Sequence, residues 1–259
     1  MRTIAVDLSE DIDRLRIDIL ADLHIGDAQC DRGLIERRIQ AIRSDPNAVC
    51  ILNGDILNNA TKTSVSDCYG EALPPMEQIQ LAVELFEPVR EKILLITTGN
   101  HERRTYRKEG IDLMEVFARQ MGVYDRFSPS SALLFVHFGR CSRRAADGRK
   151  MTYTLFVNHG SGGGRKEGAK AIRLADMACI VDADVYIHSH THLPMIFKQG
   201  MYRACLTNNS AALVDKLFVN TAAALDYGGY GDVQEYKPAS KDTPVIFLDG
   251  HRREMTASL

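Results

Sequence analysis

The amino-acid sequence predicts an α/β protein with a mixed β-sheet, and three observations support this prediction. Short apolar runs alternate with longer amphipathic segments, which is typical of strands covered by helices. The chain of 259 residues contains no internal repeat and no low-complexity tract, so we expect a single domain over residues 1–259 rather than two small ones. Hydrophobic residues make up 45% of the chain and charged residues 25%, as in ordinary soluble globular proteins, which argues against a disordered or fibrous chain.

In chain order, the sequence predicts strands that alternate with helices. The segment 75–89 shows how a helix is recognised: Ile79, Ala82 and Phe86 recur at intervals of three and four residues, on one face of a helix that would lie on a sheet. Strands are expected where a short apolar run ends in a polar loop. The expected strands cover residues 16–21, 48–53, 93–97, 133–138, 153–158, 185–188, 217–220 and 245–248. The expected helices cover residues 31–44, 75–89, 111–121 and 169–180.

A turn signal in the second half of the chain changes the expected pairing. Asp147-Gly148 lies between the runs 133–144 and 150–158. An Asp-Gly pair between two such runs is typical of the tight turn of an antiparallel hairpin. We therefore expect a mixed sheet rather than a purely parallel one.

The charge balance and the hydropathy of the chain argue against a membrane partner and against a binding surface for nucleic acid that spans the whole protein. Lys and Arg total 32 against 34 for Asp and Glu, so no global positive field would attract nucleic acid or an anionic membrane, and any affinity for polyanions must be local. Residues 1–15 lack the basic start and continuous apolar run of a secretory signal, and no stretch approaches the roughly 20 apolar residues of a membrane span. Six scattered cysteines without a CxxC pair indicate reduced thiols rather than a disulfide framework or a zinc knuckle. We expect a cytoplasmic protein without a membrane partner, and we predict no particular oligomeric state.

Nearly every expected strand ends in a loop that begins with Asp, His or Asn. Open α/β sheets bind ligands beyond the carboxyl ends of their strands, so these loops should converge on one crevice. Carboxylate oxygen together with imidazole nitrogen is the ligand set of manganese, iron or zinc, rather than of calcium or a metal that prefers thiolate. The loops hold enough such ligands for two ions. In chain order they are Ala21-Asp22-Leu23-His24, Asn53-Gly54-Asp55, Gly99-Asn100-His101-Glu102, Asn158-His159-Gly160 and His188-Ser189-His190-Thr191-His192.

The spacing inside two of these loops predicts pairs of side chains that can chelate one ion together, which we call pincers. In an extended segment side chains alternate between two faces, so Asp22 and His24 would point the same way, as would His190 and His192. Each motif alone can be explained by a purely structural role, such as a capping carboxylate in a turn or a hydrogen-bonded core histidine. Five motifs in this order, each after an expected strand, favour a metal site.

These motifs resemble those of the calcineurin-like metallophosphoesterase superfamily, whose pattern is DxH, GD, GNH followed by D or E, a lone H, and GHxH. The likeness runs from about Arg16 to Pro194. It implies a four-layer α/β/β/α sandwich of two mixed sheets and a phosphohydrolase with two divalent transition metal ions. Manganese is the expected metal, with iron and zinc as alternatives.

The resemblance also implies a role for each residue that matches the pattern. One ion would be held by Asp22, His24 and His192, the other by Asn100, His159 and His190, and both would be bridged by Asp55. His101 would be catalytic, because it would hydrogen-bond the phosphoryl group or protonate the leaving oxygen, a task that suits an imidazole near neutral pH.

The sequence departs from the family pattern at two places. Ser189 replaces the glycine before His190, which removes freedom at that backbone position but leaves the pincer intact. The protein Ser/Thr phosphatase branch has GDxxDRG, whereas Asn58 and Asn59 replace the second Asp and the Arg here. If the amide of Asn58 faces the catalytic imidazole, it would orient the ring without adding charge. These differences argue against a protein phosphatase.

Two residues of the motifs are not expected to act in the site. Glu102, directly after GNH, resembles the phosphatase branch, but we expect it to be a solvated acidic neighbour. His188 is expected to be a core histidine, or one that supports the ligands, at the end of its strand.

Basic residues that follow two of the motif loops are candidate substrate contacts. Arg103 and Arg104 come directly after the GNH motif, and Arg165 follows the glycine-rich run 161–164. Arginine can fork onto phosphate and the N–H groups of such a loop can cradle it, so a phosphate-ester substrate would fit, including a nucleic-acid backbone. The alternative is that these charges are ordinary solvated surface. The Tyr- and Gly-rich segment 226–241 is either a loop that stacks on a base or a surface loop.

The leading hypothesis is a metal-dependent phosphohydrolase, with phosphodiesters (nucleotide or nucleic acid) placed slightly ahead of phosphomonoesters. A non-catalytic scaffold with the same fold would be favoured by lost ligands, but all seven ligand positions are filled. A hydrolase of the metallo-β-lactamase type is suggested by HxHxH alone and would leave the GD and GNH motifs unexplained.

Overall fold

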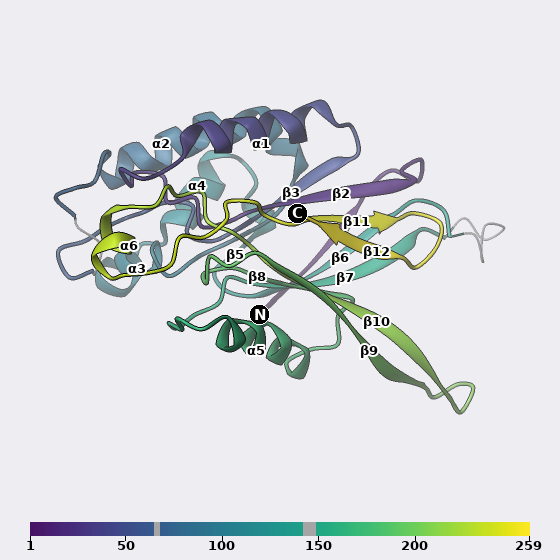
Figure 1. Ribbon diagram of the computed structural model, residues 1–259. Helices are drawn as coiled ribbons and strands as arrows, with labels where there is room; N and C mark the ends of the chain where they lie inside the picture. The colour runs from purple at the N-terminus through teal and green to yellow at the C-terminus, as the bar shows by residue number, and fades with distance from the viewer. Residues whose placement is uncertain (65–67, 142–148) are drawn as a thin grey trace.

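The computed structural model describes residues 1–64, 68–141 and 149–259. Within these residues two six-stranded mixed sheets pack face to face, and helices cover both outer faces (Figure 1), which confirms the predicted four-layer sandwich. The first sheet has the order β12 (Met255–Ser258), β11 (Val245–Asp249), β2 (Arg14–Leu20), β3 (Ala48–Asn53), β4 (Ile93–Thr97), β5 (Phe127–Ser128). The second sheet has the order β1 (Arg2–Asp7), β6 (Ala132–Phe138), β7 (Met151–Asn158), β8 (Val185–His188), β10 (Ser210–Asn220), β9 (Met195–Cys205).

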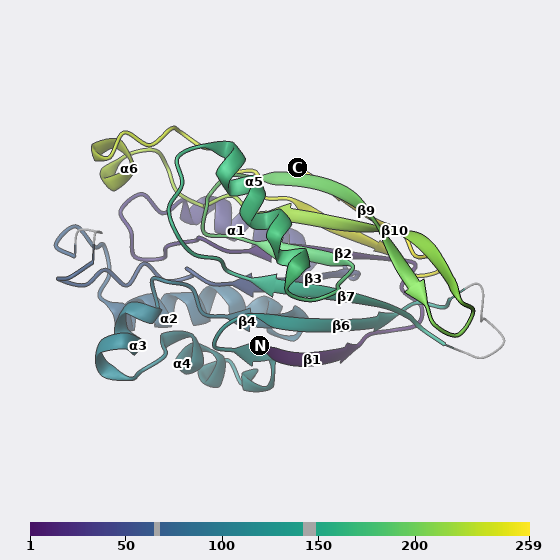
Figure 2. The same ribbon diagram turned by 90° about the horizontal axis from the view of Figure 1, so that it is seen from below.

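Helices α1 (Arg32–Ser44), α2 (Pro75–Phe86) and α4 (Leu113–Gln120) cover the first sheet, and α5 (Glu167–Asp176) covers the second (Figure 2). Helix α1 begins at a capping aspartate, because the side chain of Asp31 accepts a hydrogen bond from the backbone N–H of Leu34 at 2.9 Å. Two short helices, α3 (Arg103–Glu109) and α6 (Gly229–Val233), lie in the loops.

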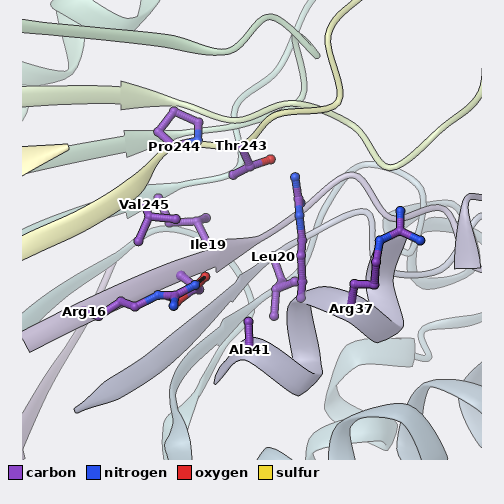
Figure 3. Close-up of a pocket in the computed structure, with 10 residues that line it drawn as sticks. Arg16, Ile19, Leu20, Arg37, Ala41, Thr243, Pro244 and Val245 are labelled. Carbon is purple, nitrogen blue, oxygen red and sulfur yellow. Dashed lines mark hydrogen bonds and ion pairs between the residues drawn. The ribbon is translucent and has the colours of Figure 1, made fainter. Parts of the chain in front are cut away.

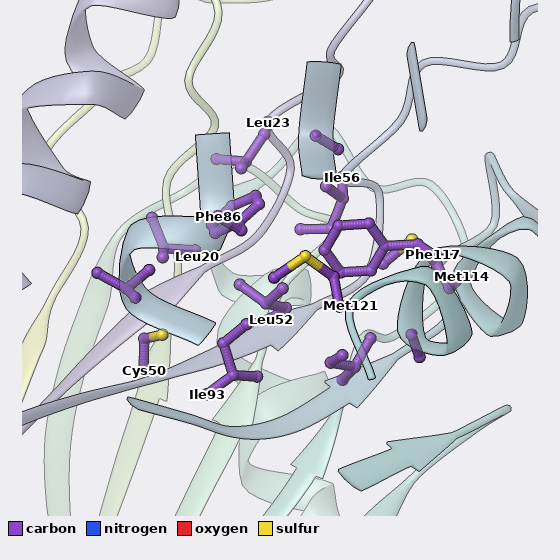
Figure 4. Packing of buried hydrophobic residues seen from close by; sticks show 14 of the residues in the cluster. Leu20, Leu23, Cys50, Leu52, Ile56, Phe86, Ile93, Met114, Phe117 and Met121 are labelled. Atoms are coloured by element: carbon purple, nitrogen blue, oxygen red, sulfur yellow. The ribbon is translucent and has the colours of Figure 1, made fainter. Parts of the chain in front are cut away.

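The four layers enclose three buried apolar clusters. Between the first sheet and its helices, Phe86 and Phe117 meet edge to face with ring centroids 6.0 Å apart, beside Leu52 of β3 (Figure 4). The cluster between the two sheets contains Ile51 and Tyr153, among others. Strands β3, β4 and β8 are buried along their whole length, and they are mostly apolar rather than alternating, as expected of strands covered on both faces.

Strand direction brings the motif loops together. In the first sheet β2, β3 and β4 are parallel, and in the second β7, β8 and β10 are parallel, so the carboxyl ends of each group meet at one edge. Strands β6 and β7 are antiparallel, which confirms the mixed sheet. The turn predicted at Asp147-Gly148 lies outside the described residues.

The eight expected strands are all present, but β1, β5, β9 and β12 were not expected. The missed strands lie at or next to the sheet edges, and β9 is mostly exposed or half-buried, so it lacks the apolar run that marks a central strand. The helix expected over residues 75–89 ends at Phe86 and continues as a 3₁₀ helix (Glu87–Lys92). Pro88 has no N–H to donate and disfavours a further α-helical turn.

None of the helices in the described ranges combines the length and the apolarity that crossing a membrane requires.

Candidate metal centre

Seven predicted ligands and the predicted catalytic histidine lie in loops at the carboxyl edge of the two sheets. The two carboxylates are the most deeply buried, since the exposed fractions of Asp22 and Asp55 are 0% and 1%. Three groups of side chains bring ligand atoms within 4.8 Å of one another, and together they contain six of the predicted ligands and His101. The groups are Asp22, His24 and His192; His24, Asp55 and His101; and Asp55, His159 and His190.

Short contacts join the members of each group. Around the first carboxylate, His192 Nε2 lies 3.3 Å from Asp22 Oδ1 and 3.4 Å from His24 Nε2. Around the second, His159 Nε2 lies 3.2 Å from Asp55 Oδ2. Asn100, the remaining predicted ligand, places its Oδ1 3.1 Å from the same His159 nitrogen. Each of the two carboxylates is therefore surrounded by imidazole side chains, and the two groups adjoin one another.

Asp22 and His24 share one ligand group as expected, but His190 and His192 lie in different groups, so the expected pairing of these two histidines is wrong. Asp22 and His24 lie beyond the end of β2, with φ of 51° and 49°, and His190 and His192 have φ of 66° and 52°. These are left-handed conformations, so the expectation of an extended segment with alternating faces is wrong. The chain instead turns sharply at each of these residues and directs its side chain into the crevice.

This backbone strain is concentrated at the predicted ligands. Within the described ranges, eight non-glycine residues have positive φ, and five of them are predicted ligands, Asp55 being the fifth with φ 49°. Such conformations cost roughly 1–3 kcal/mol each and persist where the surroundings enforce them. Their coincidence with the acidic and imidazole side chains marks a functional site rather than a set of turns.

The donor set fits divalent cations. Among the described residues, no Lys or Arg forms an ion pair with Asp22 or Asp55, so the positive partners of these buried carboxylates are imidazoles alone. The buried Nδ1 atom of His24 has no hydrogen-bond partner in the described chain. Burying a carboxylate that has no metal ion or strong cation beside it raises the free energy of the folded protein, as does burying an imidazole without a hydrogen-bond partner. Metal coordination would remove the cost of the buried carboxylates. Oxygen and nitrogen ligands without thiolate suit manganese, iron or zinc.

The pKa values of the grouped side chains are shifted because buried carboxylates and imidazoles lie close together. Burial and the neighbouring ring of His101 hold the pKa of His24 well below its usual value. Burial alone would raise the pKa of Asp55, but the imidazoles of His159 and His101 outweigh it and hold the pKa well below its usual value. Burial would lower the pKa of His159, but the facing carboxylate of Asp55 raises it to about 10. A metal ion at Asp55 would therefore compete with a proton held on His159.

Two motif glycines permit the close approach of the GD and GNH loops. A Cβ atom on Gly99 would lie 2.1 Å from Asp55 Oδ1, and one on Gly54 would lie 2.6 Å from the backbone nitrogen of Gly99. Gly54 also has φ of 73°. Any larger residue at either position would force apart the two loops that hold Asp55.

His101 lies beside the metal ligands and has a fixed tautomer. Its Nδ1 is 2.7 Å from the backbone carbonyl of Asn58, and because a carbonyl only accepts, Nδ1 must carry a proton. Its Nε2 faces the crevice, 3.8 Å from Asp55 Oδ2 and 2.9 Å from Arg104 Nη2. Burial lowers the pKa of His101, and Arg104 lowers it further.

The side chain of Asn58 does not face the catalytic imidazole. Its Nδ2 donates to Glu71 Oε1, and the backbone carbonyl of Asn58 orients the ring of His101 instead. The idea that an amide replaces the phosphatase carboxylate beside the histidine is therefore wrong. The chain turns so that the peptide carbonyl, which every residue has, occupies that place.

Glu102 is buried, so the expectation of a solvated acid is also wrong. Its exposed fraction is 0%, and its carboxylate accepts hydrogen bonds from the backbone N–H groups of Asp55, Leu57 and Gly99 at 3.1, 3.0 and 3.0 Å. Burial and the charge of Asp55 raise the pKa of Glu102 to about 7. Glu102 therefore ties the GD loop to the GNH loop, a function that its position after GNH did not reveal.

A second buried network joins the two sheets. Asn53 Nδ2 donates to Ser189 Oγ at 2.8 Å, and the backbone carbonyl of Asn53 accepts from His159 Nδ1 at 2.7 Å. Ser189, which replaces the family glycine, thus gains a hydrogen bond across the sheets. Thr221 Oγ1 donates to Asp22 Oδ2 at 3.2 Å. Asn53 and Thr221 support ligands but carry no motif signal in the sequence.

His188 is a core histidine, as expected. It is buried, and its Nδ1 lies 2.8 Å from Asn220 Oδ1, at the junction of β8 and β10. Its parity with His190 and His192 therefore does not make it a third ligand of this loop.

The three candidate substrate arginines have different surroundings. Arg104 lies against His101 in the crevice, as its 2.9 Å contact shows. Arg103 points elsewhere, because its guanidinium donates to the backbone carbonyl of Pro129. Arg165 donates to the carbonyl of Gln234 at 3.0 Å, and its guanidinium carbon lies 5.1 Å from the ring centroid of Tyr236.

The glycine-rich run and the Tyr- and Gly-rich segment 226–241 lie side by side near the centre. The contacts of Arg165 join the two segments, and Lys237 adds an ion pair with Glu167 at 2.7 Å. The carbonyl of Gly162 lies 3.1 Å from His190 Nε2, so the glycine-rich run touches the ligand cluster directly. Together these segments form a wall beside the His190 side of the crevice.

Comparison with known proteins gives a family match and several structural likenesses. The model of the calcineurin-like phosphoesterase family matches residues 15–194. Curated proteins give no match. Among solved structures, a metallophosphoesterase from Sphaerobacter thermophilus is 14% identical, with 93% of this chain and 89% of that chain covered and a TM-score of 0.41.

Two further solved structures are similar over most of their length. A conserved uncharacterized protein from Streptococcus pneumoniae TIGR4, described as a predicted phosphoesterase, is 11% identical, with 92% of this chain and 85% of that chain covered and a TM-score of 0.37. A Vps29 single mutant from Entamoeba histolytica is 12% identical, with 94% and 90% covered and a TM-score of 0.42.

Proposed function

The chain belongs to the calcineurin-like phosphoesterase family, and from this premise we propose that it hydrolyses phosphate esters with two divalent metal ions held around Asp55. The observation that carries the proposal is the pair of adjoining ligand groups, each with one buried carboxylate and two imidazoles. Loss of ligands would favour a scaffold, whereas every ligand position of the family pattern is filled here.

The ligand groups suggest how the ions are shared. One ion is held by Asp22, His24 and His192, whose ligand atoms already lie together. The other is held by His159, His190 and Asn100, with Asp55 serving both. Asp55 suits that role because its carboxylate lies near His24 in one group and near His159 in another.

The metal pair, when bound, supplies a water of lowered pKa and neutralises charge on the phosphoryl oxygens. His101 does the remaining proton chemistry, since the carbonyl of Asn58 holds its Nδ1 proton and leaves Nε2 facing the crevice. In the imidazolium form, which carries a proton on each ring nitrogen, Nε2–H would hydrogen-bond the phosphoryl group or pass its proton to the leaving oxygen, and His101 would regain that proton from solvent. Arg104, beside that nitrogen, forks onto a phosphoryl oxygen.

The finer assignments extend the same proposal. The metal is manganese, with iron or zinc as alternatives, because the ligands are oxygen and nitrogen. The substrate is a phosphodiester, a nucleotide or nucleic acid, in preference to a phosphomonoester. Arg104 contacts it through Nη2, because its Nη1 donates to the backbone carbonyl of Asn58 at 3.2 Å, and Arg103 and Arg165 contact it only after leaving their present carbonyl partners. The protein acts as a single domain in the cytoplasm.

A hydrolysis panel on metal-reconstituted protein tests this proposal. Bis(p-nitrophenyl) phosphate, p-nitrophenyl phosphate, a nucleotide, and single- and double-stranded nucleic acid are compared at equal concentration. We expect hydrolysis that disappears after exhaustive chelation, returns with manganese, and is faster for the diester than for the monoester. Full turnover in protein shown by elemental analysis to be free of metal would overturn the two-metal mechanism.

A further inference from the structure

Glu71 lies outside the motif loops, yet its carboxylate contacts the loop that orients the predicted catalytic histidine. The side chain is half-buried, in the segment that precedes helix α2. One of its oxygens, Oε1, accepts from Asn58 Nδ2 and also from the backbone N–H of Ala60, at 3.1 Å. A single carboxylate oxygen thus holds the loop of residues 58–60 at both of its ends.

The loop between these two contacts contains a strained residue. Asn59 has φ of 44°, a left-handed conformation that a residue other than glycine keeps where its surroundings enforce it. Its N–H donates to Gln78 Oε1 at 2.9 Å, and its side-chain amide donates to the backbone carbonyl of His101 at 2.7 Å. The conformation of residues 58–60 therefore depends on contacts with other segments of the chain.

Glu71 is itself fixed from two directions. The backbone N–H of the next residue, Ala72, donates to the carbonyl of Gly26, in the loop after β2, at 2.8 Å. The second oxygen, Glu71 Oε2, accepts from Nε2 of Gln78, a fully buried side chain in the first turn of α2. The same Nε2 donates to the carbonyl of Leu73 at 2.7 Å. A Cβ atom on Gly26 would lie 2.3 Å from Gln78 Nε2, so glycine at that position leaves room for the amide.

The peptide group between Asn58 and Asn59 connects these contacts to the crevice. Its carbonyl lies 2.7 Å from His101 Nδ1 and also accepts from Arg104 Nη1 at 3.2 Å. Its N–H is the group that donates to Gln78 Oε1. If this peptide rotated, the carbonyl would turn away from the imidazole and the ring would lose the partner that fixes its tautomer. The hydrogen bonds of Glu71 on both sides of the peptide oppose that rotation.

We infer that Glu71 is a positioning residue for the proposed hydrolysis. By holding the loop of residues 58–60 and the amide of Gln78, it fixes the peptide whose carbonyl orients the ring of His101, so that Nε2 faces the crevice. The inference rests on the proposed function, in which His101 acts on the phosphoryl group. Within the described chain, the hydrogen bonds of Glu71 involve no predicted metal ligand, so its loss should not remove the ions.

Three variants test the role of Glu71 in turnover of bis(p-nitrophenyl) phosphate by the manganese-loaded protein. Glu71→Ala removes both acceptor oxygens and should lower kcat by roughly 10- to 100-fold, the range for loss of a group that supports an active residue. Glu71→Gln should lower it by less, because one oxygen still accepts from the loop while the new amide meets the amide of Gln78. Glu84→Gln is the matched control, since Glu84 is an exposed glutamate of α2, and it should leave kcat unchanged. Metal content should stay at the wild-type level in all three.

A double-mutant cycle with His101→Ala separates positioning from general stability. If Glu71 acts by orienting the imidazole, Glu71→Ala should lower kcat by less than about threefold in the His101→Ala protein, because that protein has no ring to orient. A role in general stability would lower kcat by the same factor in both backgrounds.

A second measurement does not need hydrolysis. In zinc-loaded protein with isotope-labelled histidine, the nuclear magnetic resonance signal of the His101 Nδ1–H is assigned by its loss in His101→Ala. This proton should exchange slowly with solvent, because the carbonyl of Asn58 accepts it. The signal should persist in Glu84→Gln and disappear in Glu71→Ala. If the wild type hydrolyses no ester of the panel, the proposed function fails while this signal still tests the positioning. Wild-type turnover in Glu71→Ala, an equal factor in both backgrounds, or an unchanged signal in Glu71→Ala would overturn the inference.

Discussion

Two buried polar clusters lie at opposite edges of the same pair of sheets, and they are built in opposite ways. At the carboxyl edge, the predicted metal-ligand cluster around Asp22 and Asp55 contains left-handed residues and an imidazole nitrogen without a hydrogen-bond partner among the described residues. At the amino edge, the cluster of Tyr153, Asp184 and Arg253, which we call the far-edge cluster, is satisfied. Tyr153 Oη lies within 3.0 Å of three backbone carbonyls and accepts from the N–H of Glu254 at 3.0 Å.

The far-edge cluster also neutralises its own charge. Asp184 accepts from the N–H and the hydroxyl of Thr154 at 2.9 and 3.0 Å and pairs with Arg253. The contrast shows that burial of polar groups does not by itself identify a functional site. A network that satisfies every group stabilises the fold, whereas strain and unpaired donors indicate that a ligand completes the site. Variants at the two edges should therefore affect different properties.

Asp55→Asn is expected to have the largest effect on activity. One carboxylate serves both proposed ions, so its loss should lower turnover by more than the roughly 10- to 100-fold that follows from loss of a group supporting a ligand. Bound metal, measured by elemental analysis, should fall with it. Asp215→Asn, at an exposed position of β10, is the control. Wild-type turnover in Asp55→Asn would reduce Asp55 to a turn residue.

His101→Ala should lower turnover by roughly 10²- to 10⁴-fold, the range for loss of a general acid or base, with metal content close to normal. Steady-state kinetics and metal analysis on the same preparation separate chemistry from assembly. His251→Ala, at the opposite edge, should leave turnover unchanged. If His101→Ala loses one ion, His101 is a ligand, and the group of His24, Asp55 and His101 is a third coordination site.

Tyr153→Phe should show the reverse behaviour, with loss of stability and no loss of turnover. The variant removes a hydroxyl whose single proton is shared among three part-buried carbonyls, which should cost about 0.5–1.5 kcal/mol in the free energy of unfolding, measured by urea denaturation. Tyr202→Phe provides the matched change at a ring that is 79% exposed, and it should have no effect. A fall in turnover of the folded Tyr153→Phe protein would mean that the far edge influences the metal centre.

Asp184→Asn should have the smallest effect, and that effect should depend on pH. Burial would raise the pKa of Asp184, but the hydrogen bonds from Arg253 and Thr154 outweigh it and lower the pKa. A lowered pKa contributes stability above the unfolded value of about 3.9, and this contribution is lost as the pH falls through the folded value. The difference in unfolding free energy between wild type and Asp184→Asn should thus shrink below about pH 4. It should remain modest at neutral pH because the side chain of Arg253 is 45% exposed. A difference that is constant from pH 3 to pH 7 would show that the charge of Asp184 contributes nothing.

The amino-acid sequence by itself determined the order of the central strands along the chain and the residues that gather at their carboxyl ends. Both depend on local patterns: an apolar run covered on two faces marks a strand, and parallel strands bring their ends to one edge. The grouping of side chains around Asp22 and Asp55 was expected from this rule and from the resemblance of the motifs to the phosphoesterase pattern.

Only the tertiary structure decided how that edge is held together. The carboxylate of Glu102 holds two loops together because it accepts from the N–H groups of Asp55 and Leu57, 47 and 45 residues earlier in the chain. No local sequence pattern predicts that contact. Asn58 presents its carbonyl rather than its amide because the loop turns there. A cavity between β2, α1 and the start of β11 (Figure 3) likewise exists only after segments distant in sequence have packed together.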